Sequence, residues 1–317
     1  MANVQFYLPV DMTQMRILPS AVLGSSPSHL SIASGQEISV YLGSFAYVGN
    51  NVFGTVNAYE YYFGNALAAR LTGVSLDAPT VQAIAYRGDA AALQAYALGG
   101  KDDIRGSYGN DVILSYAGDD VITGGGGNDI LDGGTGRDAA FYFGKFSDYV
   151  VGRTPAGVLA VSDKVAGRDG TDYLYNIEAL SFSDAVLWMD PTATQASVYR
   201  IYQAAFDRTP DKAGISYWIG KILGGMSLRD VAYGFVNSDE YRSIYGSAPT
   251  NGQLVEKLYA NVLGRSGEAS GVAYWTKALN DGASVLDVLA SFAELPENFA
   301  RTKASIEAGF LIDPSYF

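Results

Sequence analysis

A nine-residue repeat occupies the middle of the chain, from residue 97 to residue 141. An aspartate recurs at every ninth residue, a glycine precedes each aspartate by two positions, and an apolar residue follows by two. The aspartates are Asp102, Asp111, Asp120, Asp129 and Asp138, the glycines are Gly100, Gly109, Gly118, Gly127 and Gly136, and the apolar residues are Ile104, Ile113, Ile122, Leu131 and Ala140. Five repeats in strict phase favour a folded repeat structure over a flexible glycine-rich linker, because a linker needs no fixed spacing.

The composition of the repeat predicts calcium binding. Glycines allow the backbone to turn through conformations that other residues avoid. Such turns bring peptide carbonyls together, and with the aspartate carboxylates they offer the oxygen ligands that Ca²⁺ prefers. The three residues around each apolar position predict a short strand, so two repeats make one coil and each ion lies between repeats two apart. The predicted pairs are Asp102 with Asp120, Asp111 with Asp129, and Asp120 with Asp138, which gives about three full sites.

This pattern resembles the RTX family of calcium-binding parallel β-rolls. The resemblance implies that Ile104, Ile122 and Ala140 point inward from one side, and Ile113 and Leu131 from the other. The repeats also depart from the family pattern. Leu98, Ser107 and Ser115 stand where the pattern has glycine, and Ala140 is a weak apolar residue that predicts the end of the roll.

The sequence predicts a multidomain α+β protein. Residues 1–75 form a β-rich domain, with strands expected at residues 4–8, 37–42 and 52–59. Residues 76–190 form the roll with its caps, and residues 76–98 are expected to cover its open N-terminal end. Short helices are predicted at residues 65–71, 78–86 and 90–98. After the repeats, strands up to residue 190 are expected to form a second cap, with Asp169, Asp172 and Asp184 as either extra calcium ligands or solvated turn residues.

Residues 191–317 predict a helical domain that contains two 57-residue repeats and a C-terminal tail. The two copies align without gaps from Tyr202 to Glu240 and from Tyr259 to Glu297, and each is expected to contain three helices. The pattern resembles a helical domain of unassigned function that occurs beside RTX repeats in secreted and surface-layer proteins. Trp218 and Trp275 match between the copies and are expected to anchor the core, with glycan binding as the alternative.

Composition and motifs argue against several classes of function. The net charge is −12, which disfavours a nucleic-acid partner. One histidine, His29, cannot supply a His-Glu-x-x-His zinc site, and no Gly-x-Ser-x-Gly motif is present. The sequence contains no run of about 18 apolar residues, so no transmembrane helix is predicted. We therefore expect a protein that is not an enzyme, although a carbohydrate-active enzyme that uses only carboxylates leaves no short motif and stays an alternative, as does a glycan-binding module.

The expected function is that of a secreted calcium-binding protein with a structural or adhesive role. The RTX resemblance implies export from a Gram-negative bacterium by type I secretion. We accordingly expect no N-terminal signal peptide, and the sequence contains no cysteine. Calcium outside the cell is expected to fold the roll. The predicted roles are assembly of a surface layer, matrix or filament, or attachment, and the expected partners are copies of the chain itself or a cell-surface glycan.

Overall fold

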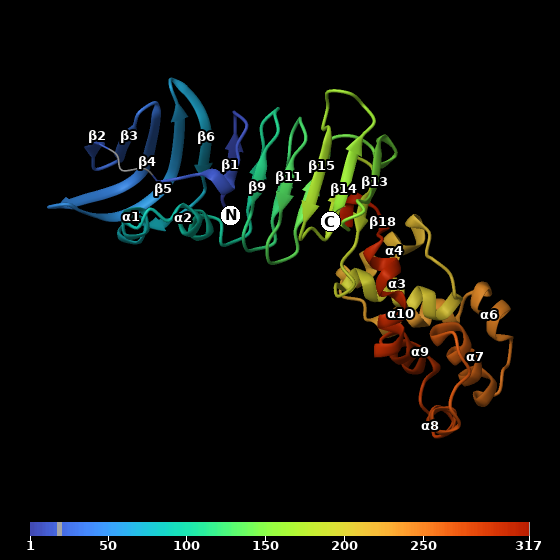
Figure 1. The fold of residues 1–317 in the computed structure, drawn as a ribbon. Coiled ribbons are helices and arrows are strands. Elements are labelled where there is room, and N and C mark those ends of the chain that lie inside the picture. Colours follow the sequence, from blue (N-terminus) through green and yellow to red (C-terminus); the bar gives the residue numbers. More distant parts are fainter. Residues whose placement is uncertain (18–20, 317) are drawn as a thin grey trace. The chain divides into compact units, whose positions relative to one another are not determined.

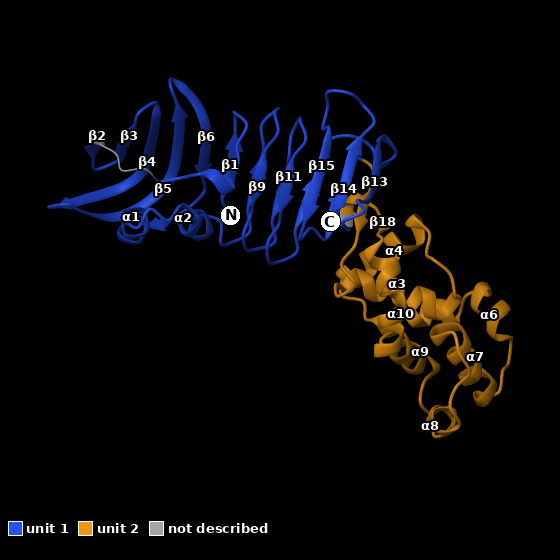
Figure 2. Ribbon diagram, in the orientation of Figure 1, with its two compact units in different colours: residues 1–183 blue, residues 184–317 orange. Residues whose placement is uncertain are grey.

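The structure is a computed structural model that describes residues 1–17 and 21–316. The chain divides into two compact units, residues 1–183 and residues 184–317 (Figure 2). The first unit contains the nonapeptide repeats and is rich in β-structure, whereas the second is mainly helical. The α+β composition predicted from the sequence is confirmed.

Short parallel strands in the repeat region form two sheets. One sheet contains β8 (Asp103–Arg105), β10 (Val121–Thr123), β12 (Ala139–Phe141) and β16 (Ala179–Ser181). The other contains β9 (Val112–Leu114), β11 (Ile130–Asp132) and β15 (Thr171–Tyr175), which lie side by side in Figure 1. Successive repeats therefore alternate between the sheets, and this arrangement fits a parallel β-roll.

The central residue of each repeat strand is fully buried. Ile104, Ile122 and Ala140 lie in the first sheet, and Ile113 and Leu131 in the second; each is 0% exposed. A three-residue strand points only its middle side chain to one face, so one apolar residue per repeat is enough to fill the core. The two sets are those expected from the sequence.

The N-terminal strand β1 (Asn3–Phe6) extends the first repeat sheet. It pairs in parallel with β8 on one side and antiparallel with β6 (Ala66–Thr72) on the other. The sheet then continues through long antiparallel strands in the order β5, β4, β3 and β2, with β7 paired to β5. Their bounds are β2 Ala21–Ser26, β3 His29–Ser34, β4 Glu37–Val48, β5 Asn51–Phe63 and β7 Leu76–Asp77.

The segment expected to cover the open end of the repeats, residues 76–98, contains strand β7 and two helices. Helix α1 (Ala78–Tyr86) packs on β5, and α2 (Ala90–Ala97) follows it. The exposed edge of β8 is instead covered by β1, because strand pairing satisfies the backbone groups of that edge directly. Helix α2 lies beside this region, where the Tyr116 hydroxyl donates to the Gln94 side chain at 2.6 Å.

The helix predicted at residues 65–71 is wrong, because these residues form strand β6. Alanine and leucine favour helices in isolation, yet here both edges of the segment pair with other strands, β5 and β1. The helices predicted at residues 78–86 and 90–98 are confirmed. Asp89 caps the second of them, since its carboxylate accepts from the backbone N–H of Ala92 at 3.0 Å.

An antiparallel hairpin separates β12 from β15 in the chain. Strand β13 (Tyr149–Arg153) pairs with β14 (Leu159–Asp163), and β14 pairs with β15 at the margin of the second repeat sheet. Tyr142, Tyr149 and Phe182 pack together at this margin, with ring centroids 5.1–5.4 Å apart. The hairpin therefore closes the sheet with antiparallel strands and aromatic side chains.

The second unit contains two sets of four helices and an antiparallel pair of short strands. The first set is α3 (Thr194–Phe206), α4 (Lys212–Leu223), α5 (Leu228–Val236) and α6 (Asp239–Tyr245); the second is α7 (Asn251–Leu263), α8 (Ala269–Asn280), α9 (Val285–Ala293) and α10 (Pro296–Glu307). The strands are β17 (Val186–Trp188) and β18 (Phe310–Ile312). Three helices were expected in each repeat; the fourth helices, α6 and α10, were not predicted.

The two helical sets share one core and repeat the same contacts. Trp218 packs against Phe235 in the first set, and Trp275 packs against Phe292 in the second, both with ring centroids 5.2 Å apart. Ser227 and Asp230 form a reciprocal capping box at the start of α5. At α9, Ser284 alone caps the helix.

Candidate metal centre

The five repeat aspartates form a ladder of side-chain to backbone hydrogen bonds. In Asp120, Asp129 and Asp138, one carboxylate oxygen accepts from the backbone N–H of the aspartate eighteen residues earlier. The N···O distances are 2.7 Å for Asp102 to Asp120, 2.8 Å for Asp111 to Asp129, and 2.9 Å for Asp120 to Asp138. The pairs predicted from the sequence are therefore direct neighbours.

The second carboxylate oxygen is the unusual feature of this ladder. In Asp102, Asp120, Asp129 and Asp138 it is buried and has no hydrogen-bond partner within the protein. Asp111 differs, because its second oxygen accepts from the backbone N–H of Ser107 at 2.7 Å and from its hydroxyl at 3.0 Å. Buried carboxylate oxygens without a donor are costly, so each indicates a missing partner such as a cation.

Burial also shifts the titration of these carboxyl groups. It raises the pKa of Asp120 to about 6 and the pKa values of Asp129 and Asp138 to about 7. The pKa values of Asp102 and Asp111 are raised by the same cause. Without a cation the negative charges are therefore unfavourable here, and a bound divalent ion reverses that preference.

Three of the predicted glycines allow neighbouring turns to stack closely. Gly118, Gly127 and Gly136 have φ angles of 132°, 113° and 138°. A Cβ atom at Gly118 or Gly136 would come within 2.1 Å or 1.8 Å of the carbonyl oxygen of the glycine eighteen residues earlier. These turns thus bring backbone carbonyls against one another. Gly100 and Gly109 lack a positive φ, and Gly109 packs against Pro9 instead.

Within residues 1–17 and 21–316, no three histidine, aspartate or glutamate side chains converge to hold a metal ion. A cation in the repeat turns must therefore take most of its ligands from backbone carbonyls, with carboxylates completing the set. Carbonyl and carboxylate oxygens are the ligands of Ca²⁺. The unpartnered oxygens and the crowded carbonyls of the turns fit that ion.

The ladder continues beyond the five repeats through residues that the periodicity does not reach. Asp172 accepts from the backbone N–H of Asp129 at 3.0 Å, and Glu178 accepts from that of Asp138 at 2.8 Å. Burial raises the pKa of Asp172 to about 8. The continuation at Asp172 can be recognised in the sequence, because Gly170, Asp172 and Leu174 keep the spacing of the repeat.

The continuation at Glu178 is harder to recognise from the repeat pattern. Asn176 stands in place of the glycine with a φ of 52°, Glu178 in place of the aspartate, and Leu180 in place of the apolar residue. Asparagine tolerates the left-handed region better than most residues. Of the other two acids named as extra ligands, Asp169 accepts from the Tyr149 hydroxyl, and Asp184 lies in the second unit.

At the other end, the N-terminal residues occupy the preceding positions of the ladder. The backbone N–H groups of Ala2 and Val10 donate to the carboxylates of Asp102 and Asp111, the latter at 2.6 Å. Neither residue has a carboxylate of its own. The ladder therefore ends here without acidic side chains.

Comparison with known protein families agrees with this geometry. The RTX calcium-binding nonapeptide repeat, in its four-copy form, matches residues 96–131 and 105–139. The central segment is an RTX repeat array. A domain of unknown function, DUF4214, matches residues 189–243 and 232–302, which cover most of the helical unit.

Other comparisons add little to the RTX assignment. No curated protein shows significant similarity to the chain. The extracellular lipase LipA from Serratia marcescens has 26% identity over a match that covers 26% of this chain and 13% of the lipase chain, with a TM-score of 0.24. That structural likeness carries no argument about fold or activity.

The RTX array makes this a calcium-binding protein, and such repeats are typical of secreted proteins. In the part of the chain that the structure describes, no helix has the length and apolar character needed to span a bilayer. The geometry of the array therefore relates to calcium binding, whereas the helical unit has no assigned role.

Gly134→Ala should destabilise the calcium-bound protein more than Gly167→Ala. Both glycines have similar φ angles, 78° and 76°, so both variants carry a backbone strain of about 1–2 kcal/mol. Only at Gly134 does the new Cβ meet the Tyr116 carbonyl oxygen, at 2.0 Å, which adds about 1–3 kcal/mol. Urea unfolding in excess calcium measures the difference. Equal losses would show that the turns do not stack as described.

Proposed function

We propose that the chain is a secreted structural or adhesive protein whose RTX array is folded by calcium outside the cell. The observation that carries the proposal is the set of four buried aspartate oxygens without hydrogen-bond partners. Each lies in a turn where carbonyls of adjacent repeats meet. A protein that kept these oxygens unpartnered would be destabilised by them.

The ladder indicates where the ions bind. Three sites lie between the aspartate pairs of the array, namely Asp102 with Asp120, Asp111 with Asp129, and Asp120 with Asp138. Two further positions follow at the C-terminal end, between Asp129 and Asp172 and between Asp138 and Glu178. The predicted glycines and aspartates would hold the ions together with the turn carbonyls.

Calcium binding should be coupled to folding. Without the ion, clustered carboxylates repel one another and lose their hydration on burial, which favours the unfolded array. With the ion, the binding free energy becomes folding free energy. A low calcium concentration inside the cell then keeps the chain unfolded for type I secretion, and a millimolar concentration outside folds it.

The proposed role after export is self-assembly or attachment at the surface of a Gram-negative bacterium, without catalysis. Ile130 and Tyr173 are neighbours on the outer face of the second repeat sheet and are each 40% exposed. Tyr175, two residues further along β15, is 43% exposed. Exposed apolar side chains that lie together suit lateral protein contacts in a layer, matrix or filament.

Calcium removal tests the proposal. Far-ultraviolet circular dichroism should show a large loss of β-signal when chelator replaces about 5 mM Ca²⁺, a concentration in the range of extracellular sites. The helical signal of residues 184–317 should remain, and Mg²⁺ at the same concentration should not restore the β-signal. Identical spectra with and without Ca²⁺ would contradict the proposal. Electron microscopy of the two samples separates assembly into ordered polymers from attachment by single molecules.

A further inference from the structure

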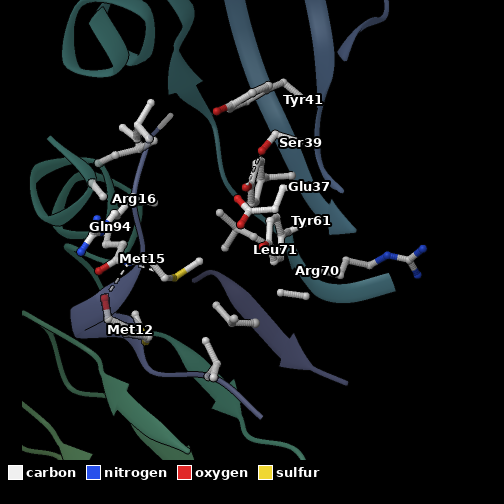
Figure 3. A pocket seen from close by; sticks show the side chains of 18 of the residues that line it. Met12, Met15, Arg16, Glu37, Ser39, Tyr41, Tyr61, Arg70, Leu71 and Gln94 are labelled. Atoms are coloured by element: carbon white, nitrogen blue, oxygen red, sulfur yellow. Dashed lines mark hydrogen bonds between the residues drawn. The ribbon is translucent and has the colours of Figure 1, made fainter. Parts of the chain in front are cut away.

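A cavity of about 440 Å³ lies in the first unit, beside the N-terminal end of the RTX array. Residues of β1, β3, β4, β5 and β6 line one side, and residues 9–17 together with α2 line the other (Figure 3). The volume falls within the range of roughly 300–1,000 Å³ that is typical of small-molecule sites. The cavity is therefore large enough to hold an organic ligand.

Most of the wall is apolar. The side chains that give it this character are Val4, Phe6, Met12, Met15, Leu71 and Leu93. Met12 and Met15 lie opposite the sheet strands in Figure 3. Methionine side chains are flexible and polarisable, so this side of the cavity can adapt to the shape of a ligand.

The sheet side of the cavity has its polar groups on β4 and β5, whereas Gln94 on the opposite side already bonds to Met12 and Tyr116. Glu37, Ser39 and Tyr41 alternate along β4 and therefore face the same side, as Figure 3 shows. The Ser39 and Tyr59 hydroxyls are 3.0 Å apart, and the rings of Tyr41 and Tyr59 have centroids 5.1 Å apart. A mostly apolar cavity with a few polar groups is the usual arrangement of a site that orients its ligand.

Tyr41 and Tyr59 line a part of the cavity that is largely shielded from solvent. Tyr41 and Tyr59 keep part of their surface accessible, yet burial raises the pKa of Tyr41 to about 12 and that of Tyr59 well above its usual value. Their hydroxyls therefore stay protonated at neutral pH and can donate hydrogen bonds to a ligand.

The charges around the cavity disfavour an anion. Glu37 and Arg70 both belong to the lining, but the Arg70 guanidinium extends away from the cavity in Figure 3 and pairs with Glu60 at 2.7 Å. Arg16 also belongs to the lining but is exposed to solvent, which screens its charge. A buried anion without a desolvated cation beside it is costly.

We propose that this cavity binds a neutral, largely apolar small molecule that has a hydroxyl group at one end. The apolar body lies between the methionines and the sheet, and its hydroxyl group reaches the polar wall formed by Glu37, Ser39 and Tyr59. The ligand hydroxyl donates to the Glu37 carboxylate or accepts from the Ser39 and Tyr59 hydroxyls. This binding activity is separate from calcium binding by the RTX array.

Three ten-carbon probes test the proposal on the full chain in excess Ca²⁺. Displacement of the dye Nile red by 1-decanol, decanoate and decylammonium measures binding, with decanol below its solubility limit and each charged probe below its critical micelle concentration. Decanol should displace the dye with a saturable 1:1 curve, and decanoate should bind at least about tenfold more weakly because of its uncompensated charge. Absence of saturable decanol binding overturns the proposal, as does equal or tighter binding of either charged probe.

Two variants assign the binding to this cavity. Ala69→Phe should fill the space and abolish dye and decanol binding, whereas Tyr108→Ser, at a residue that is 96% exposed and outside the lining, should leave both unchanged. Should Ala69→Phe fail to fold by circular dichroism, Glu37→Gln gives an independent test. It should raise the affinity for decanoate relative to that for decanol, because the glutamine side chain can still bond to the ligand hydroxyl but carries no negative charge. The assignment is contradicted if Glu37→Gln leaves the ratio of decanol to decanoate affinity unchanged. It is also contradicted if a folded Ala69→Phe protein binds the dye and decanol as the wild type does.

Discussion

Asp129→Asn should nearly abolish calcium-dependent folding of the RTX array at millimolar calcium. Asp129 is 0% exposed, accepts from the backbone N–H of Asp111, and donates its own N–H to Asp172. It therefore contributes to two positions of the ladder, and the substitution removes one negative charge from both. Residues that only orient metal ligands cost about 10–100-fold in affinity when they are changed, so loss of a shared ligand should exceed that range.

Calcium titrations followed by circular dichroism measure the effect, and two further variants calibrate it. Asp102→Asn should weaken folding less, because its N-terminal neighbour in the ladder, Ala2, has no carboxylate. Asp103→Asn is the matched control. The Asp103 side chain lies on the outer face of β8, where it pairs with the exposed Arg105, and its loss should cost less than about 1 kcal/mol. Equal midpoints for the variants of Asp129 and Asp103 would contradict the proposed ligand positions.

The sequence predicts the centre of the RTX array well because its signal is local. Each repeat contains a turn glycine, an acid and an inward apolar residue at fixed spacing, so Ile113 and Ile122 had to lie on opposite sheets. The aspartate pairs follow from the same period. Nothing beyond nine-residue phasing is needed to place them.

The ends of the array depend on contacts between distant residues, which periodicity does not reveal. Strand β1 pairs with β8 although about one hundred residues separate them. The ladder positions before Asp102 and Asp111 are held by Ala2 and Val10, which have no acidic side chain. At the other end, the hairpin of β13 and β14 interrupts the phase before Asp172 and Glu178 resume it. The last position of the ladder does not match the repeat pattern, because Asn176 and Glu178 stand in place of glycine and aspartate.

Strand β6 shows how pairing overrides local preference. Its sequence, from Ala66 to Thr72, favours a helix when it is considered alone, yet it lies between two strands that both need partners. Helix α1 has no such competition, because Asp77 and Pro79 define its start locally. Local signals therefore predict α1, whereas β6 depends on strand partners that are distant in the sequence.

Phe235→Ala should destabilise the helical unit by about 3–5 kcal/mol and leave the calcium-dependent transition of the first unit in place. Phe235 is 3% exposed, and its ring packs against Tyr202, Phe206 and Trp218 with centroids 4.8–5.2 Å apart. The ring belongs to the core that both helical sets share, so its removal should lower the stability of all eight helices described for this unit.

Tyr233→Ala is the matched control for this prediction, since Tyr233 lies on the same helix and is 61% exposed. It should change stability by no more than about 0.5 kcal/mol. Thermal unfolding followed at a helical wavelength measures both variants, and a calcium titration of the β-signal then follows the RTX array separately. Because residues 1–183 and 184–317 form separate compact units, the calcium midpoint should be the same in Phe235→Ala and in the wild type. A shifted midpoint would show that the helical unit stabilises the folded array, so that calcium outside the cell would act on both units together.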